Sequence, residues 1–202
     1  MLARAAGSPL VRGGLTIGAG IVTGNLTGFF RVALNAYLLG TDSLADSLAV
    51  AIGPIDTLNA VLINTMVFAF VPMLTERQGE ARTALFVRLR RLFFLVFLAL
   101  SAAIAVFAPW LIRVLAPGLA SDYLVKAEWN LRLGALSTLA AGTAAVHSAL
   151  LYTERRFAPS AFYQASLNVA TVLSALALWS RLGVYSFAVG YAAGAWVQFG
   201  VV

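Results

Sequence analysis

One arginine, Arg31, lies inside an otherwise uncharged apolar stretch that runs from Gly13 to Leu39. A guanidinium at membrane depth costs about 2.5 to 3.5 kcal/mol on insertion scales, so it usually faces a polar cavity on a binding or transport path. Asn25 adds a polar side chain to the same stretch. We therefore take Arg31, with Asn25, as the first candidate binding residues.

The next apolar stretch is unusual because polar residues interrupt it. Asp56, Asn59 and, more loosely, Asn64 recur at intervals of three to five residues. Such a stripe falls on one side of a helix and does not face lipid, so it should line the interior as candidate substrate-binding residues. Hydrogen bonding between helices is the alternative explanation for the asparagines. An ion pair between Asp56 and Arg31 is attractive, but no sequence rule places the two in contact.

Glycines at four-residue intervals mark the first stretch. Gly20, Gly24 and Gly28 fall on one helical face, and small residues at this spacing allow a second backbone to approach closely. They predict helix packing, with the alternative that they leave room for a bulky ligand beside Arg31. Together with Asp46, we take them as candidate gate or helix-packing residues.

Enzymatic and metal chemistry are disfavoured by the residue inventory. The chain has no cysteine and a single histidine, His147, which cannot build a metal site alone. No grouping of serine, histidine and aspartate has a recognisable local context, and no two carboxylates are spaced for paired acid–base work. We expect no catalytic residues, no metal and no cofactor, and no residue identifies a coupling ion.

The composition indicates the elements that must hold these residues. Hydrophobic residues make up 61% of the chain and charged residues 11%, and mean hydropathy is +0.88, whereas soluble domains carry about 25% charged residues. Long unbroken apolar runs fit helices and not barrel strands. We predict an all-α membrane protein with six transmembrane helices, at about 13–39, 45–74, 85–108, 131–152, 158–179 and 184–202.

Basic residues set the predicted orientation, because positive charge is retained in cytoplasmic loops. Nine arginines fall on one side of the predicted membrane, and the opposite side is nearly neutral. The N-terminus is therefore predicted to be cytoplasmic. The nine are Arg4, Arg12, Arg77, Arg82, Arg88, Arg90, Arg91, Arg155 and Arg156. The net charge of +6 then reflects topology and attraction to anionic membrane lipids, and nucleic-acid binding is not needed to explain it.

The predicted sixth helix ends abruptly at Gly200, Val201 and Val202, without a polar or basic flank. Many transporters are built from repeated bundles with the substrate between them. We therefore expect residues 1–202 to form one six-helix lobe, with a C-terminal lobe missing from this chain.

Several ordered motifs resemble one transporter family. They are Gly28-Phe29-Phe30-Arg31, Gly40 with Ala45-Asp46, Ala69-Phe70-Val71-Pro72-Met73-Leu74, Ala108-Pro109-Trp110-Leu111 with Ala116-Pro117-Gly118, Leu151 to Phe157, and Pro159 through Leu167-Asn168. In order and spacing they resemble the MurJ (MviN) family of lipid II flippases over nearly the whole chain.

The resemblance implies the fold of the multidrug/oligosaccharidyl-lipid/polysaccharide exporter superfamily, with this chain as its N-terminal lobe. It also implies a task in bacterial cell-wall synthesis: moving polyprenyl-pyrophosphate-linked peptidoglycan precursor across the plasma membrane by alternating access. Arg31 matches a family cavity arginine, and arginine suits bidentate binding of phosphate.

The chain departs from the family pattern at three places. Asn25 stands where the family usually has another arginine, and Thr57, Leu58 and Asn59 occupy the neighbourhood of a usual arginine pair. Val32 replaces the acidic residue that usually follows the matched arginine. Arg31 thus stands almost alone in this lobe as a cation for the head group.

Three alternatives stay open at this point. The chain could belong to a flippase for another polyprenyl-linked glycan, or to an ion-coupled drug or metabolite exporter of the same superfamily that uses Asp56 or Asp46 as its cation-responsive carboxylate. From a different class, it could be a non-transporting membrane scaffold for envelope synthesis. In that case the cavity residues should tolerate substitution.

Overall fold

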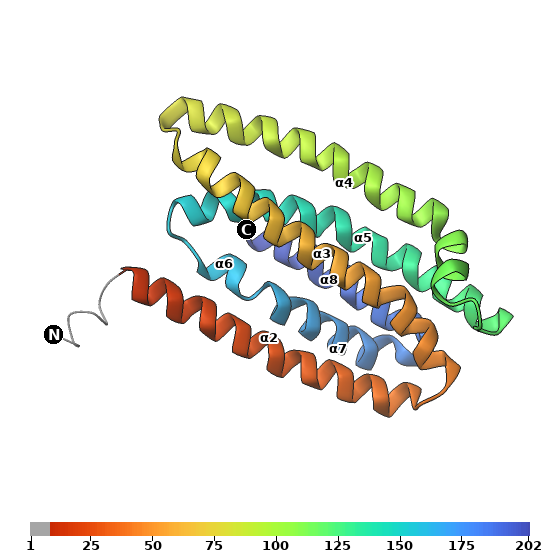
Figure 1. Ribbon diagram of the computed structural model, residues 1–202. Helices are drawn as coiled ribbons and strands as arrows, with labels where there is room; N and C mark the ends of the chain where they lie inside the picture. Colours follow the sequence, from red (N-terminus) through yellow and green to blue (C-terminus); the bar gives the residue numbers. More distant parts are fainter. Residues whose placement is uncertain (1–8) are drawn as a thin grey trace.

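The computed structural model describes residues 9–202, which fold into seven helices without a strand (Figure 1). Residues 1–8, and with them Arg4, lie outside the described residues. The helices are α2 (Pro9–Leu39), α3 (Ser43–Thr75), α4 (Gly79–Leu115), α5 (Ser121–Thr153), α6 (Ala158–Ala161), α7 (Tyr163–Leu182) and α8 (Tyr185–Val201).

Five of the described helices, α2, α3, α4, α5 and α7, are long and apolar enough to cross a membrane. With 17 residues, α8 is shorter than the roughly 20 that usually span a bilayer. The predicted all-α membrane architecture is confirmed, with six spans as an approximate count. Both α4 and α5 extend beyond the predicted apolar ranges, because apolarity marks only the membrane-embedded part of a helix and their charged ends continue the same helix.

The predicted fifth span is divided in two. A short helix, α6, ends at Ala161, and α7 begins at Tyr163 after a break at Phe162. Pro159 lies in the first turn of α6, where the missing backbone N–H costs nothing. The long helix therefore begins about five residues later than the apolar pattern predicts.

The packed centre of the lobe is α5, which contacts α3, α4 and α8. Its buried side chains are mostly small, among them Gly134, Ala135, Ala141, Gly142 and Ala145. Without a hydrophobic driving force between helices in lipid, close backbone approach supplies the packing energy. The buried core around Leu131 and Ala135 joins α5 to α3, α4, α7 and α8.

The position of α2, at the opposite edge from α4, creates an open face (Figure 1). Its main partners are α7 and the short α6, and it scarcely touches α3 along most of its length. The turn at Gly40, with φ of 66°, connects α2 to α3, and the two helices diverge from there toward the start of α2 (Figure 1). This divergence positions the candidate site between α2 and α3.

Candidate functional site

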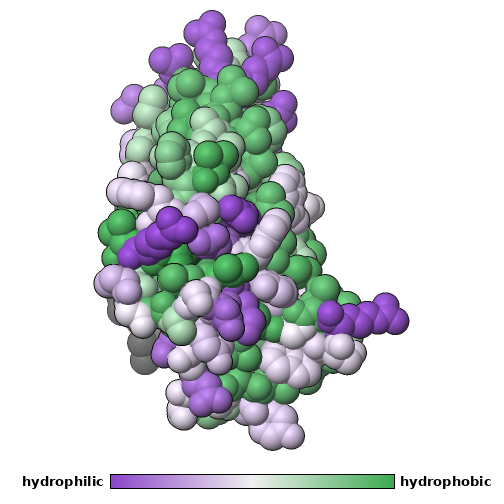
Figure 2. Space-filling model, turned by 90° about the vertical axis from the view of Figure 1, so that its right-hand side faces the viewer, coloured by the Kyte–Doolittle hydropathy of each residue, from purple (hydrophilic) through white to green (hydrophobic). Residues whose placement is uncertain are grey.

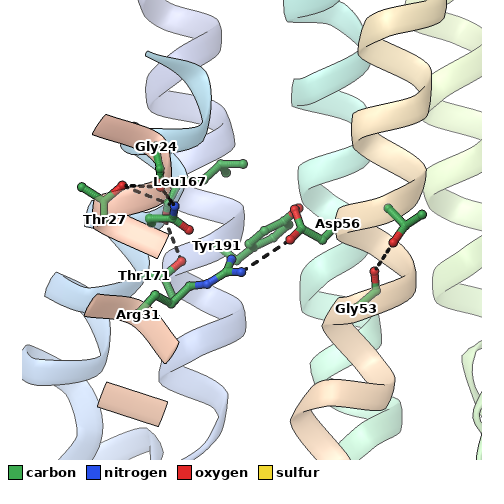
Figure 3. A network of polar contacts seen from close by, with 10 residues as sticks. Gly24, Thr27, Arg31, Gly53, Asp56, Leu167, Thr171 and Tyr191 are labelled. Carbon is green, nitrogen blue, oxygen red and sulfur yellow. Dashed lines mark hydrogen bonds and ion pairs between the residues drawn. The ribbon is translucent and has the colours of Figure 1, made fainter. Parts of the chain in front are cut away.

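Arg31 reaches from α2 toward α3 and meets Asp56 (Figure 3). The distance from Nη2 of Arg31 to Oδ2 of Asp56 is 3.5 Å, and the two side chains are 19% and 30% exposed. This is the only ion pair within residues 9–202. It links two helices that otherwise have little contact. The ion pair with Asp56, which the sequence suggested without a rule to place the two residues in contact, is thus present in the structure.

Tyr191 on α8 gives Asp56 a second partner. Its hydroxyl donates a hydrogen bond of 2.9 Å to Oδ1 of Asp56, and its side chain is almost fully buried. The two carboxylate oxygens thus have different partners, one on α2 and one on α8. The bond from Tyr191 is the shorter of the two, and Arg31 meets the carboxylate at the longer distance.

Two polar atoms beside this cluster are buried and have no hydrogen-bond partner. They are Nη1 of Arg31 and Oδ1 of Asn35, one turn further along α2. Buried polar atoms are usually paired, so unpaired ones call for a ligand or a water. One is a charged donor and the other a neutral acceptor, so together they match a group that carries both anionic oxygens and hydroxyls.

Both residues line a cavity of about 380 Å³ between α2, α3, α7 and α8. Asp56, Tyr191 and Thr171 supply its remaining polar groups, and most other lining residues are apolar. An apolar pocket with a few convergent polar groups is the usual form of a binding site for a small molecule or head group. We call this space the Arg31 cavity.

A second cavity, of about 470 Å³, continues along the same divergence toward the start of α2. Ile17 of α2, Asn64 and Val71 of α3, and Tyr163 of α7 are among the residues that line it. The hydroxyl of Tyr163 is buried and unpaired. The two cavities thus follow one another along α2 and α3, on either side of the Arg31–Asp56 pair.

A family model described as "Lipid II flippase MurJ" matches residues 35–202. The chain belongs to the MurJ lipid II flippase family. The family resemblance noted in the motifs is thereby confirmed, and it identifies a family of flippases.

A solved structure, "Lipid II flippase MurJ, inward closed conformation", shares the fold. Its TM-score is 0.80 at 22% sequence identity, and the match covers 92% of this chain and 40% of that one. The chain thus spans about two fifths of the length of the MurJ structure. The family-model match begins at Asn35, four residues after Arg31, so the Gly-Phe-Phe-Arg element lies just before it.

The predicted polar residues other than Asn59 separate into three groups in this fold. Arg31 and Asp56 lie together at the Arg31 cavity, and Asn64 lines the second cavity. Asn25 and Asp46 are exposed and line neither cavity.

Asn59 has a position that differs from the expectation. Its side chain is almost fully buried, and Nδ2 donates a hydrogen bond of 2.9 Å to the hydroxyl of Ser137 on α5. It faces the packed centre and not the divergence between α2 and α3. Asn59 therefore makes a hydrogen bond between helices, which was the alternative explanation for the asparagines, and does not line a cavity.

The glycine face of α2 is covered by α6 and α7. A methyl group at Gly20 would collide with the carbonyl of Ala161, and one at Gly24 would lie 3.1 Å from Cβ of Gln164. Asn168 of α7 lies beside Gly28 and donates a hydrogen bond of 3.0 Å to the carbonyl of Gly24. Neighbouring helices thus pack against this face, which leaves no room there for the bulky ligand considered as the alternative to helix packing.

Sequence reasoning missed Asn35, Tyr191 and Tyr163 as residues that line these two cavities. Asn35 had a signal, because a residue four positions after Arg31 on a helix lies on the same face. Tyr191 and Tyr163 had none, since their place beside the cavities depends on how α7 and α8 pack against α3.

Proposed function

We propose that this chain is the head-group-binding lobe of a flippase that moves lipid-linked peptidoglycan precursor across the bacterial plasma membrane by alternating access. The lobe would act with a second lobe that completes the cavity. Membership of the MurJ family supports this function. The observation that carries it is the unpaired, buried Nη1 of Arg31 at the edge of the Arg31 cavity.

The chemistry of the head group fits this atom. A pyrophosphate presents several anionic oxygens, and a guanidinium offers parallel donors at matching spacing. Arg31 uses only Nη2 for Asp56, at the long distance of 3.5 Å. Nη1 is therefore the position at which a phosphate oxygen would bind first, with the hydroxyls of the sugar within the polar part of the cavity near Asn35.

Asp56 would serve as the resting counter-ion. A charge in a membrane is tolerated when it is paired, and the carboxylate supplies that pairing while the cavity holds no head group. Because Tyr191 bonds the other carboxylate oxygen, the side chain of Asp56 would keep its position when Arg31 turns toward a phosphate. Arrival and departure of the anion would then exchange one partner of Arg31 for another.

The wall composition supports a lipid-linked substrate over a free anion. Apolar side chains such as Leu48, Ile52 and Phe187 line most of the Arg31 cavity. They provide no binding groups for a highly charged soluble ion. A substrate with a charged head and a long polyprenyl tail can place the head at Arg31 while the tail remains in the bilayer.

The exporter alternative would use Asp56 as a cation site. The guanidinium of Arg31 already pairs with this carboxylate, and its positive charge disfavours a metal cation or sodium ion at the same place. This arrangement favours the flippase over the cation-coupled exporter.

Translocation by the full-length protein in proteoliposomes tests the proposal. Arg31→Ala should lower the rate of lipid II translocation by at least about tenfold, because it removes charge-assisted hydrogen bonds to the head group. Arg31→Lys should retain part of the rate, since it keeps the charge and loses the paired donors.

Arg113→Ala is the matched control, because Arg113 lies in the last turn of α4 and lines neither cavity. Arg31→Ala alone leaves the Asp56 carboxylate without its cation. The double variant with Asp56→Asn removes that charge and reports whether any loss of translocation comes from misfolding. If Arg31→Ala, correctly folded, translocates lipid II at the wild-type rate, the proposal fails.

A further inference from the structure

A third groove lies on the outer side of the lobe and has no part in the site described above. It encloses about 410 Å³ between α4, α5 and α8, and none of its lining residues lines the Arg31 cavity or the second cavity. Arg90 and Arg91 of α4 lie at the groove, and Phe94, Leu95 and Phe199 supply apolar walls. We call it the Arg90 groove.

The position of the two arginines along α4 places them at the level of lipid phosphates. They are the last charged residues before an uncharged run of 21 residues, Leu92–Ile112, which ends at Arg113. At 1.5 Å per residue this run is about 32 Å long, close to the thickness of the hydrocarbon core. Arg90 and Arg91 therefore lie at one membrane interface, and Phe94 and Leu95 lie about one turn deeper.

The surface view agrees with this placement. Hydrophilic side chains gather at the top of Figure 2, at the height at which α4 begins in Figure 1, and a hydrophobic band lies directly below them. Arg90 and Arg91 are both exposed. The Arg90 groove thus has a basic end at the interface and an apolar length within the hydrocarbon region.

The charge of the groove is uncompensated. Within residues 9–202, Arg90 and Arg91 form neither an ion pair nor a hydrogen bond, and no acidic residue lines the groove. Two adjacent guanidiniums without a counter-charge favour a ligand with net negative charge over a zwitterion. An anionic phospholipid provides that charge together with acyl chains for the apolar walls.

His147 forms the polar floor of the groove in a fixed orientation. Its Nδ1 lies 2.9 Å from the carbonyl of Thr143, which can only accept, so Nδ1 carries the proton. Phe86 and Phe199 contact the ring edge to face, with centroids 5.2 Å and 5.6 Å away. The other nitrogen, Nε2, has no hydrogen-bond partner within the described residues, and in the neutral ring it accepts from a hydroxyl.

From these features we propose that the Arg90 groove binds one anionic glycerophospholipid, with its phosphate at Arg90 and Arg91 and an acyl chain against Phe94, Leu95 and Phe199. A glycerol head group also carries hydroxyls that suit Nε2 of His147. The site is independent of the proposed flippase activity, because it lies on a different face of the lobe and is tested by binding.

The test measures retained lipid on the full-length protein in a neutral detergent, by native mass spectrometry during titration with dioleoyl phosphatidylglycerol. Wild type should retain one lipid, and Arg90→Gln with Arg91→Gln should weaken its binding by about 30-fold. Arg77→Gln with Arg88→Gln removes the same charge from the link before α4 and from α4 itself, at residues that do not line the groove, and should bind as wild type.

Two further probes identify the ligand chemistry. Dioleoyl phosphatidylcholine should bind at least about tenfold more weakly than phosphatidylglycerol, since it lacks net charge. Glycerol 1-phosphate, which lacks acyl chains, should not compete. The proposal is overturned if the Arg90 and Arg91 variant retains phosphatidylglycerol like wild type, if both double variants lose it equally, or if glycerol 1-phosphate displaces it.

Discussion

Helices α2 and α5 are nearly equal in length, 31 and 33 residues, yet they lie in opposite surroundings. Other helices surround α5, and most of its inner half is buried. In contrast, α2 is held along one face by α6 and α7, and the rest of its surface is exposed. The fold is therefore anchored on α5, while α2 can present polar groups to a cavity without being part of the packed core.

The polar residues of the two helices show the same contrast. On α5, the hydroxyl of Ser137 accepts a hydrogen bond from Asn59 of α3, and this bond is buried between the helices. On α2, Arg31 and Asn35 each keep one buried polar atom unpaired at a cavity. Ser137 on α5 therefore contributes to packing, whereas Arg31 and Asn35 on α2 each leave a polar atom available to a ligand.

Overpacking should separate the packed face of α5 from the open face of α2 most strongly. Gly142 of α5 faces the ring of Phe97, with which any added side chain collides. Gly142→Leu should lower the free energy of unfolding by about 1 to 3 kcal/mol, as overpacked cores do. Thermal unfolding of the full-length protein in detergent measures the change.

Gly14→Leu provides the matched control on α2, because no atom lies within 4 Å of the added carbon. It should leave the unfolding midpoint nearly unchanged. Equal destabilisation by both variants would mean that the open face of α2 is packed as closely as α5, and the contrast between the two would be lost.

Removing a polar side chain should lower the free energy of unfolding by less than overpacking does, and again more at the packed centre than on the exposed side of α2. Asn59→Ala breaks the 2.9 Å bond to Ser137 between α3 and α5. Hydrogen bonds between membrane helices contribute about 0.6 kcal/mol on average and up to about 1.7, so the loss should be near 1 kcal/mol.

Asn25→Ala on the exposed side of α2 serves as its comparison and should have no measurable effect on unfolding. Chemical denaturation in mixed micelles is sensitive enough for both. Should Asn25→Ala destabilise more than Asn59→Ala, Asn25 would have to be part of the packing of α2.

Much of the fold was predictable because helix ends have local causes. Gly40 and Arg155 adopt positive φ in gaps between the predicted spans, and Ala116-Pro117-Gly118 lies in another of these gaps and separates α4 from α5. The interruption at Phe162 was not predictable, because nothing in the apolar pattern changes there. It depends on how α6 meets Gly20 of α2.

The candidate site was predictable only in part. Arg31 and Asp56 could be identified because each is a charge in an apolar helix, and that signal needs no tertiary information. Asn59 carried a similar polar signal but faces α5, since a stripe on a helix does not reveal which neighbour it meets. Tyr191 looks like an ordinary apolar-helix residue until α8 packs beside Asp56.

The central claim is that Arg31 receives the anionic head group and Asp56 is its resting counter-ion. Equilibrium binding of a polyprenyl diphosphate to the full-length protein, compared among wild type, Arg31→Ala and Asp56→Asn, tests it most directly. We predict that Arg31→Ala weakens binding by about tenfold or more, whereas Asp56→Asn does not weaken it, because removing the carboxylate leaves both guanidinium nitrogens for the phosphate. Wild-type affinity in Arg31→Ala, or equal weakening in both variants, would contradict the claim.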